Sequence, residues 1–395
     1  MPHRLRLAII TTHPVQYYAP WFRYLSENTP LTLKVFYLWD FGISTREDPA
    51  FKKSFQWDIP LLDGYESELV PNKSADPGTH HFKGIDNPEL SARISEWKPD
   101  AVLLIGYNYS TLLHFIKTWN RHAVPMIFRG DSHRIAETTS VLRRAVKQIA
   151  LRLLYARFAA FLPVGTANAA YFRSYGVPAR KLFLAPHAVE NSRFEEAANK
   201  TDIAKLRAEW QIPADTTIFL FVGKLESKKR PMDLLEAFAQ SSSPNTALVF
   251  AGSGELEDSL RQRASQISEP VRFLGFKNQS EMPAVYACSD VLVLPSYGSY
   301  ETWGLAVNEA MACGKPAIVS SHVGCAEDLI LPGKTGWRFE AGDVAALRAC
   351  IEDAATNRTR VVEMSRHAQE FITSHNSYQT ASQGLLRALE SIYPS

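Results

Sequence analysis

Two glutamates in the second half of the chain, Glu301 and Glu309, lie close to a predicted helix start. The apolar run 291–296 (VLVLPS) is typical of a buried strand, and a helix is expected from about residue 304 to 313, where Gly314 ends it. Glu309 follows Leu305 by one helical turn, so both carboxylates can face one cleft. Carboxylates accept hydrogen bonds from hydroxyl groups, which indicates a site for a sugar and a ribose.

The start of this helix is also a predicted phosphate site. The first backbone amides of a helix have no partner within it, and the helix dipole places partial positive charge there. We therefore expect the amides of Trp303, Gly304 and Leu305 to orient a phosphate, with Gly304 allowing close approach. A pair of glutamates at this spacing is common by chance, so the pair gains its weight from the phosphate site between its members.

The segment PSYGSYETWGLAVNEAMACGKPAIVSS resembles the signature of the family 4 retaining glycosyltransferases, which have the GT-B fold. Trp303 replaces the usual Phe of that signature. The resemblance extends through FVGKLESKKRPMDLLEAFA, FAGSGELEDSL and RFLGFKNQSEMPAVYACSDVLVLPS. It implies a metal-independent hexosyltransferase that uses a nucleotide-sugar and retains the anomeric configuration.

The resemblance also implies roles for individual residues. Lys224 and Lys229 are expected to bind the donor diphosphate, where positive charge stabilises the leaving group. Lys224 replaces the usual Arg, so it offers a point charge in place of a bidentate fork. Glu301 is expected on the sugar hydroxyls and the developing charge, and Glu309 on the ribose. The segment containing Gly275 and Phe276 is expected to contact the nucleobase.

The first half departs from the family pattern at two places. The loop after the first strand commonly carries Gly-Gly near the donor phosphate, and here His13 and Pro14 occupy it, with Gln16 nearby. These three residues are candidates for contact with the phosphate or the acceptor, and a loop that only shapes a turn is the alternative for His13. In VPMIFRGDSHR, either Asp131 or His133 is expected to replace the cleft histidine of the family.

Two series of strands alternating with helices predict an α/β protein of two Rossmann-like halves facing across a cleft, as in the GT-B fold. The first series has strands at Leu5 to Thr11, Leu31 to Tyr37, Ala101 to Ile105, Pro125 to Phe128 and Ala160 to Val164, and the second begins near Thr217. We expect an acceptor-side domain at 1–190, a polar linker at 191–202, a nucleotide-sugar domain at 203–374 and a C-terminal helix at 375–395 that crosses back to the first domain.

Other cofactors are not expected. Gly252-Ser-Gly254 follows a strand, but Glu257 holds the third glycine position of a dinucleotide fingerprint, which disfavours an NAD enzyme. The chain contains no Asp-x-Asp, so no metal is expected on the donor. The adjacent pair His80 and His81 is expected to point in different directions and to lie exposed in a loop. The four cysteines have no zinc-like spacing and are interpreted as reduced thiols.

The charge balance limits the partners. A formal charge of +2, from 43 basic and 41 acidic residues, gives no global field for nucleic acid. No apolar run has the length of a signal peptide core or a membrane span, which favours a cytoplasmic protein. Residues 141–162 alternate apolar and basic side chains, a pattern that suits peripheral contact with anionic lipid on the inner membrane face or, alternatively, a helix packed on the first domain.

The predicted function is transfer of a sugar from a nucleotide-diphosphate donor, UDP-sugar before GDP-sugar, to a hydroxyl of a glycan, a lipid-linked molecule or a small molecule. The pathway expected by analogy is the synthesis of bacterial polysaccharide or glycoconjugate. Because one fold supports several chemistries, a sugar-nucleotide epimerase and a phosphorylase remain alternatives. The replaced Gly-Gly and the displaced histidine leave a noncatalytic nucleotide-binding subunit as a third alternative.

Overall fold

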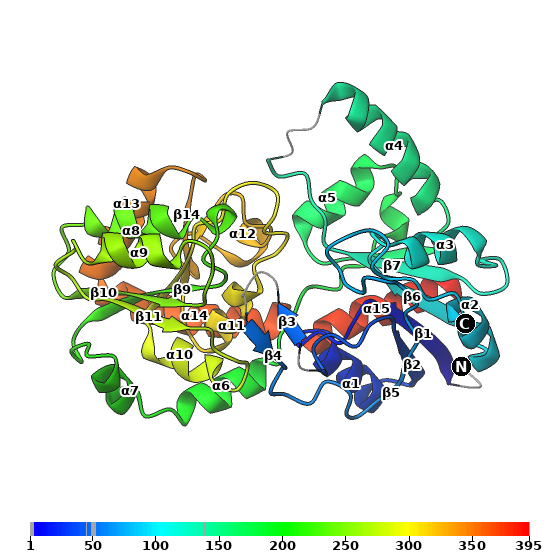
Figure 1. The fold of residues 1–395 in the computed structure, drawn as a ribbon, viewed down its shortest axis with the longest axis horizontal. Coiled ribbons are helices and arrows are strands. Elements are labelled where there is room, and N and C mark those ends of the chain that lie inside the picture. The colour runs from blue at the N-terminus through cyan, green and yellow to red at the C-terminus, as the bar shows by residue number, and fades with distance from the viewer. Residues whose placement is uncertain (1–3, 45, 49–52, 137–139, 395) are drawn as a thin grey trace.

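The computed structural model describes residues 4–44, 46–48, 53–136 and 140–394. Most of this chain forms two bodies side by side, each built around a six-stranded sheet (Figure 1). Every neighbouring strand pair in both sheets is parallel. The predicted α/β fold with two Rossmann-like halves is therefore confirmed.

The two sheets share one strand order. Both place their first strand in the middle, so that the order reverses beside it. The first sheet runs β5 (Glu66–Leu69), β2 (Leu31–Tyr37), β1 (Leu5–Thr11), β6 (Ala101–Ile105), β7 (Met126–Gly130) and β8 (Ala160–Pro163). The second runs β11 (Val271–Gly275), β10 (Thr246–Ala251), β9 (Thr217–Val222), β12 (Val291–Leu294), β13 (Ala317–Ser320) and β14 (Gly336–Phe339).

Helices connect successive strands and cover the sheets. In the first domain these are α1 (Ala19–Asn28), α2 (Leu90–Trp97), α3 (Ser110–Thr118), α4 (Val141–Tyr155) and α5 (Thr166–Ser174). In the second they are α7 (Ile203–Glu209), α8 (Pro231–Ala239), α9 (Glu257–Ala264), α10 (Met282–Cys288), α11 (Leu305–Ala312), α12 (Ala326–Leu329) and α13 (Val344–Thr356). A short antiparallel pair, β3 (Arg46–Asp48) and β4 (Lys53–Phe55), and two 3₁₀ turns, Ala179–Lys181 and Ser227–Lys229, complete these connections.

Alternation along the strands builds a core on each face of a sheet. In β1, Leu7 and Ile9 join one buried cluster, while Ala8 and Ile10 join the cluster on the other face. All four side chains are fully buried. A strand that is apolar on both faces is the signature of a parallel sheet covered by helices, which explains why β1 is apolar almost without interruption.

The polar segment 191–202, which the sequence predicts to be a linker, contains a helix of the second domain. Residues Asn191–Asn199 form α6, which packs against α10 and α11. Phe194 and Ala198 are its buried anchors and belong to the core cluster that contains Tyr286. The linker prediction is corrected because these two apolar side chains, one turn apart, are enough to hold an otherwise polar helix.

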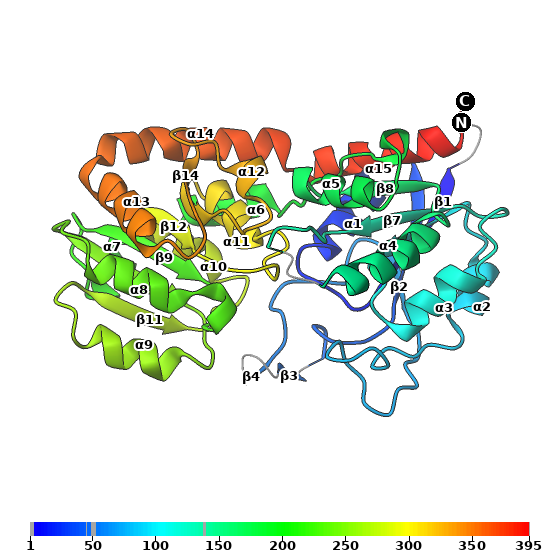
Figure 2. The ribbon, with the colours of Figure 1, turned by 90° about the horizontal axis from the view of Figure 1, so that it is seen from above.

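The chain crosses between the domains a second time near its C-terminus. Helix α14 (Arg358–His375) packs against α11 of the second domain, and α15 (Tyr378–Ile392) packs against α1 and β8 of the first. Figure 2 shows the two helices in succession along one side of the molecule. Trp21 donates a hydrogen bond to Ser382 at 3.1 Å, which fixes α15 to α1.

The basic amphipathic segment 141–162 is not one helix. Helix α4 ends at Tyr155, and residues 160–162 lie in the buried strand β8. Leu151 and Tyr155 are the buried residues of α4, while Leu142, Val146, Ile149 and Leu153 are exposed. The prediction is corrected in its C-terminal part, because the apolar residues there pack within the sheet. No helix of the described ranges is long and apolar enough to span a bilayer.

Candidate active site

A cavity of about 400 Å³ lies between the two domains, at the carboxyl ends of the central strands. Its walls come from the loops that follow β1 and β7 in the first domain and β9 and β12 in the second. Lining side chains are Val15, Tyr17, Tyr18, Asp131 and His187 on the first-domain side, and Val222, Gly223, Lys229, Leu294, Glu301, Thr302, Trp303, Gly304, Leu305, Ala306 and Glu309 on the other. The strand order reverses at this place in both sheets, where α/β folds bind ligands.

Lys229 and Glu301 form an ion pair in this cavity. The Lys229 Nζ lies against Glu301 Oε2, and the two side chains are 21% and 13% exposed. Ser296 Oγ donates a further hydrogen bond to the same carboxylate oxygen at 3.1 Å. The loops carrying the pair are tied together where the Tyr297 amide donates to the Lys228 carbonyl at 2.9 Å. The second domain therefore holds one cation and one carboxylate side by side at the cavity.

The preceding residue, Lys228, lies outside this arrangement. Lys228 is 44% exposed and pairs with Glu226 at 3.2 Å. Its Nζ also lies 5.6 Å from the ring centroid of Tyr300. Of the two adjacent lysines, Lys229 is the one whose side chain lines the cavity.

The N-terminus of α11 opens into the cavity through Gly304. This residue has φ of +98°, which disfavours any side chain. An added Cβ would also lie 2.8 Å from Val323 and 3.0 Å from Leu294, both in the core. Trp303 is 3% exposed and donates from its indole to Asn308 at 2.8 Å, which locks the turn before the helix. The predicted anion site at Trp303, Gly304 and Leu305 is thus a fixed backbone turn on a rigid element.

Glu309 is a buried carboxylate in a cage of hydroxyl and amide groups. It accepts from the Tyr286 hydroxyl at 2.7 Å and from Gln279 Nε2 at 3.3 Å. Tyr17 of the first domain also hydrogen-bonds to it. Burial raises the pKa of Glu309, because desolvation penalises its charged form, while these hydrogen bonds oppose the rise. The Glu309 carboxylate lies in the middle of α11 and suits neutral hydroxyl partners better than an anion.

The two alternatives in the first domain, Asp131 and His133, take different positions. Asp131 lines the cavity and accepts from the Thr302 hydroxyl at 2.8 Å across the domain boundary. His133 Nε2 donates to the Glu301 carbonyl at 3.3 Å, and its Nδ1 accepts from the Ile135 amide at 3.2 Å. Burial lowers the pKa of His133, so the ring is neutral with its proton on Nε2. The side chain of Asp131 faces the cavity, and that of His133 holds the loop of Glu301.

His13 and Pro14 do not line the cavity. The His13 ring makes edge contacts with Trp39 and Phe41, with centroids 5.8 and 5.5 Å away. Burial among them lowers the pKa of His13 to about 4, so the ring is neutral at pH 7. Gln16 hydrogen-bonds to the Tyr17 side chain. Among the candidates at this loop, the aromatic contacts favour the turn-shaping alternative for His13.

Three other predicted residues lie outside the set that lines the cavity. Lys224 follows the lining residue Gly223, but its side chain is not part of the wall. Gly275 ends β11 with φ of +69°, and a Cβ added there would meet nothing within 4 Å. Phe276 comes next along the chain and is partly buried. The open space beside Gly275 leaves room for a planar group, in keeping with its predicted contact to a nucleobase.

Sequence reasoning missed four residues of the first-domain wall, which are Val15, Tyr17, Tyr18 and His187. Tyr17 and Tyr18 follow β1, and His187 lies where the chain leaves the first domain. The His187 ring lies between Tyr18 and Trp303, with centroids 6.0 and 5.7 Å away. Burial, together with nearby Arg129, lowers its pKa well below the ordinary value. Tyr17 and Tyr18 follow a central strand, and this position could have predicted that they line the cavity. The sequence around His187 contains no such signal.

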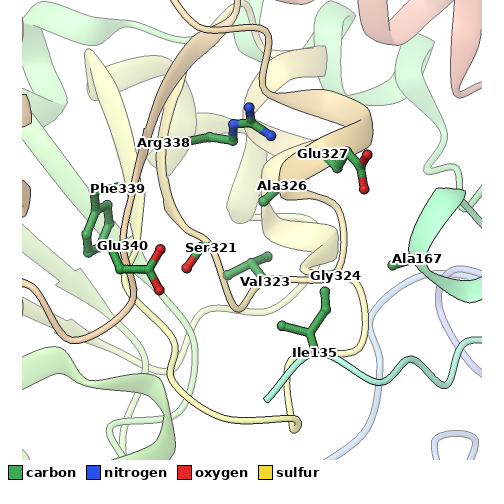
Figure 3. Close-up of a pocket in the computed structure, with 10 residues that line it drawn as sticks. All are labelled: Ile135, Ala167, Ser321, Val323, Gly324, Ala326, Glu327, Arg338, Phe339 and Glu340. Atoms are coloured by element: carbon green, nitrogen blue, oxygen red, sulfur yellow. The ribbon is translucent and has the colours of Figure 1, made fainter. Parts of the chain in front are cut away.

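A second cavity, of about 490 Å³, also lies between the domains and shares no lining residue with the first. Figure 3 shows Arg338 and Phe339 of β14 and the following Glu340 on one wall, with Ile135 and Ala167 of the first domain on another. The remaining lining residues are Ser321, Val323, Gly324, Ala326 and Glu327. The Gly324 amide donates to the Glu301 carbonyl at 3.0 Å, so this cavity borders the back of the loop that carries Glu301.

Polar contacts join the two domains on both sides of the cavities. Asp328 of α12 accepts from the Thr166 amide at 3.0 Å and from its hydroxyl at 2.6 Å, and thereby caps α5. Asp58 accepts from the Ser280 amide at 3.1 Å, and Asn278 donates to the Gln56 carbonyl at 2.8 Å. The two domains are therefore joined by direct hydrogen bonds around the cavities.

Comparison with known proteins identifies the second domain. Residues 202–371 match the family model described as glycosyl transferases group 1. The second domain is thus similar to the group 1 glycosyltransferases over these residues. This domain carries Lys229, Glu301, Glu309 and the start of α11, so the residues placed together at the cavity lie within the matched range.

Individual relatives agree with this family. Glycogen synthase of Mycobacterium tuberculosis is 32% identical over 165 residues, which are 41% of this chain and 39% of that enzyme. The chain thus spans about two fifths of the length of that relative, within the group 1 domain. D-inositol 3-phosphate glycosyltransferase of Rhodococcus opacus is 24% identical over 353 residues, 81% of this chain and 77% of the relative.

A solved structure extends the similarity to the whole fold. HepE of Anabaena, solved in complex with UDP, superposes with a TM-score of 0.75 over 98% of this chain and 100% of its own. The sequence identity is 18%, so this likeness shows the fold alone. The predicted GT-B architecture is confirmed for both domains together.

Proposed function

We propose that the protein is a retaining glycosyltransferase that moves a sugar from a nucleotide-diphosphate donor to a hydroxyl acceptor. The observation that carries the proposal is the Lys229–Glu301 pair at the N-terminus of α11, inside a cavity lined by both domains. The pair brings together a charge for a phosphate leaving group and a carboxylate for a sugar. The match of the second domain to the group 1 glycosyltransferases supports the same activity.

The leaving group of this reaction is a nucleoside diphosphate, which gains negative charge as the glycosidic bond breaks. Lys229 and the backbone amides at the start of α11 supply compensating positive charge for this group. When the donor is absent, Lys229 is neutralised by Glu301. We propose that the diphosphate takes over this lysine and leaves Glu301 to the sugar hydroxyls and the positive charge that develops at the anomeric carbon.

We further propose that transfer needs no divalent metal, because the lysine and the helix start provide the charge that a metal supplies in other enzymes. Addition of EDTA to the assay is expected to leave the transfer rate within about twofold of its original value. Loss of activity that Mg²⁺ or Mn²⁺ restores would contradict this part of the proposal. We propose that the carboxylate of Glu309 and the hydroxyls of Tyr17 and Tyr286 bind the ribose of the donor.

UDP-sugar is the proposed donor, with GDP-sugar second. The complex of HepE with UDP supports UDP through the shared fold, and the open space beside Gly275 supports room for a base. A thermal-shift screen with UDP, GDP, ADP and dTDP tests the choice, because a ligand that binds the native state raises the melting temperature. We expect the largest rise with UDP. A larger rise with GDP would reassign the donor, and no rise with any of the four would overturn nucleotide-sugar binding.

Turnover is tested by incubating the preferred nucleotide-sugar with a panel of bacterial glycan and lipid-linked acceptors and analysing the products by mass spectrometry. The expected product carries one added hexose with retained anomeric configuration, as read by NMR. Isomerised nucleotide-sugar without acceptor would favour an epimerase. Phosphate-dependent cleavage of a glycan would favour a phosphorylase. Tight nucleotide binding without any product would favour a noncatalytic subunit.

We propose that the acceptor is a glycan or a lipid-linked molecule of a bacterial polysaccharide or glycoconjugate pathway, and that it reaches Glu301 from the side of the second cavity. Arg338, Glu327 and Glu340 offer donors and acceptors for hydroxyl groups there (Figure 3). Arg338→Ala is expected to raise the acceptor KM severalfold while nucleotide binding stays unchanged. Arg366→Ala on α14 is the control, since Arg366 pairs with Glu370 on an exposed helix.

The exposed face of α4 is the proposed contact with a membrane. Leu142, Val146, Ile149 and Leu153 recur at helical spacing on one face and are 61% to 76% exposed. The same helix carries Arg143 and Arg152 and contains no acidic residue. Figure 1 places α4 at the edge of the molecule, away from the second domain. An apolar face bordered by basic groups suits the surface of an anionic bilayer, which supports the proposed peripheral contact with the inner face of the membrane.

Vesicle sedimentation tests this contact. We expect binding to vesicles of phosphatidylglycerol and phosphatidylcholine, weak binding to phosphatidylcholine alone, and loss of binding in Leu142→Glu/Ile149→Glu. Val362→Glu is the matched control, because Val362 is a 64% exposed apolar residue on α14, outside the proposed surface. Equal sedimentation of the double variant and the original protein would overturn the membrane contact.

A further inference from the structure

The loop between β5 and α2 brings together three metal-ligating side chains that the active site does not use. These are Asp76, His80 and His81, whose ligand atoms all lie within 4.8 Å of one another. His80 Nε2 is 3.0 Å and His81 Nε2 is 3.3 Å from the same carboxylate oxygen of Asp76. The two adjacent histidines therefore converge, which corrects the sequence-based expectation that they point apart.

A closed turn makes this convergence possible. The Gly78 amide donates to the Gly84 carbonyl at 3.1 Å, and the Gly84 amide donates to the His81 carbonyl at 3.2 Å. A Cβ at Gly84 would lie 2.1 Å from the Gly78 carbonyl oxygen, so only glycine fits. The Tyr109 hydroxyl donates to the Thr79 carbonyl at 3.1 Å and holds the turn against the start of α3. The histidine backbone is thus fixed before any ion binds.

The geometry points to a divalent transition metal, and we propose that Asp76, His80 and His81 bind Zn²⁺. Zinc takes imidazole nitrogen and carboxylate oxygen at about 2.0–2.2 Å, and two such ligands on a tetrahedral ion lie about 3.4 Å apart. The separations of 3.0 and 3.3 Å from Asp76 Oδ2 are near this value. The ion lies between the three ligand atoms and takes water as a fourth ligand, since all three side chains reach solvent.

The exposure of the site fits a reversible zinc site that stiffens a loop. The side chains of Asp76, His80 and His81 are 71%, 53% and 37% exposed, so an ion enters without opening the fold. Zinc would join Asp76 to the histidines four and five residues later and close the turn around Gly78. The site contains no residue of the donor cavity.

Isothermal titration of the EDTA-treated, dialysed full chain with ZnCl₂ at pH 7.5 tests the proposal. We expect one strong site per chain, weakened at least about tenfold in His80→Ala and in Asp76→Ala. His122→Ala is the matched control, since His122 is an exposed histidine of the same domain, and it should bind like the original protein.

Zinc binding of equal strength in His80→Ala, Asp76→Ala and the original chain would overturn the proposal, because the ion would then bind elsewhere. No heat of binding at 100-fold excess of zinc would also overturn it and leave a histidine–carboxylate hydrogen-bonded cluster. A second readout is the melting temperature, which zinc should raise in the original protein and not in the His80→Ala/His81→Ala variant. Both measurements are made without nucleotide, so they are independent of the proposed transfer activity.

Discussion

The carboxyl edges of the two sheets have the same strand order and present different chemistry to the cavity between them. The edge of the second sheet presents an ion pair, Lys229 and Glu301, and the N-terminus of α11. The edge of the first presents Tyr17, Tyr18 and a neutral His187, with Asp131 as its one charged lining group. The strand order is therefore common to both edges, and the loops that follow the strands determine which side chains each edge presents.

This difference suggests a division of work. The charged edge of the second sheet is suited to stabilise the leaving phosphate when the bond between sugar and phosphate breaks. The edge of the first sheet, with its aromatic rings and hydroxyls, is suited to position the acceptor. If the division holds, substitutions at the edge of the second sheet should lower turnover far more than those at the first. The expected effects below run from the largest to the smallest.

Glu301→Ala should lower the transfer rate by about 10²–10³-fold, because it removes a carboxylate aimed at developing positive charge. Nucleotide binding should persist, since Lys229 and the α11 amides remain. The measurement is a progress curve with saturating donor. Glu226→Ala is the control, because Glu226 pairs with the outward-facing Lys228, and it should change the rate by less than about twofold. Activity retained in Glu301→Ala would refute the role of the pair.

Lys229→Ala should weaken nucleotide-diphosphate binding and lower turnover by about 10²-fold, since an uncompensated leaving group raises the barrier. Lys228→Ala is the matched control one residue away, with its side chain outside the cavity. Titration calorimetry with UDP and the transfer assay measure both effects. Equal losses in the two lysine variants would show that a general basic patch, and not Lys229, binds the phosphate.

Asp131→Ala should lower turnover by about tenfold with nucleotide affinity unchanged, because Asp131 lies on the positioning edge. Thr302→Val removes the interdomain hydrogen bond to Asp131 while keeping the carboxylate. Comparison of kcat and KM for the two variants separates a substrate contact from a domain contact. Equal defects would mean that Asp131 acts only by holding the domains together.

His13→Phe should leave activity at pH 7.5 within about twofold and change the response of stability to acid. The pKa of His13, about 4 when folded, is below its ordinary value of 6.5. The unfolded chain therefore binds the proton first, and the native state loses up to about 3 kcal/mol of stability as pH falls from 6.5 toward 4. Urea unfolding at pH 7.5 and pH 4.5 should show a smaller drop for the variant. An identical drop, or a large loss of activity, would contradict a buried structural role.

The fold was largely predictable from apolar periodicity. The bounds of β1, β2 and β6 agree with the sequence prediction to the residue. Strands β1 and β6 leave nearly uninterrupted apolar runs, and β2 alternates apolar with polar residues over its first half. Helix α6 was not predicted, since two anchors, Phe194 and Ala198, do not stand out in a polar segment. The overlong prediction for α4 has the same origin, because an amphipathic helix and the buried strand after it share apolar residues.

The candidate site was predictable only where charged side chains and a helix start lie in one short segment of the sequence. Glu301, Gly304 and Glu309 lie within nine residues of sequence and all line the cavity. Tyr17 and His187 are brought there by packing between distant elements, and a lone tyrosine or histidine has no spacing to recognise. Asp131 and His133 are two residues apart, and only the direction of each side chain separates their roles. The convergence of His80 and His81 likewise depends on a turn that closes through Gly84.

The two places where the chain passes between the domains lie against each other. Asn376 donates to the His187 carbonyl at 3.2 Å, and Asn191 donates to the Asn376 carbonyl at 3.2 Å. We expect two adjacent crossings bound in this way to act as one hinge, which favours rotation of the domains over sliding. Because the His187 ring projects from this hinge into the donor cavity, rotation that admits a donor would also turn the aromatic wall that receives it.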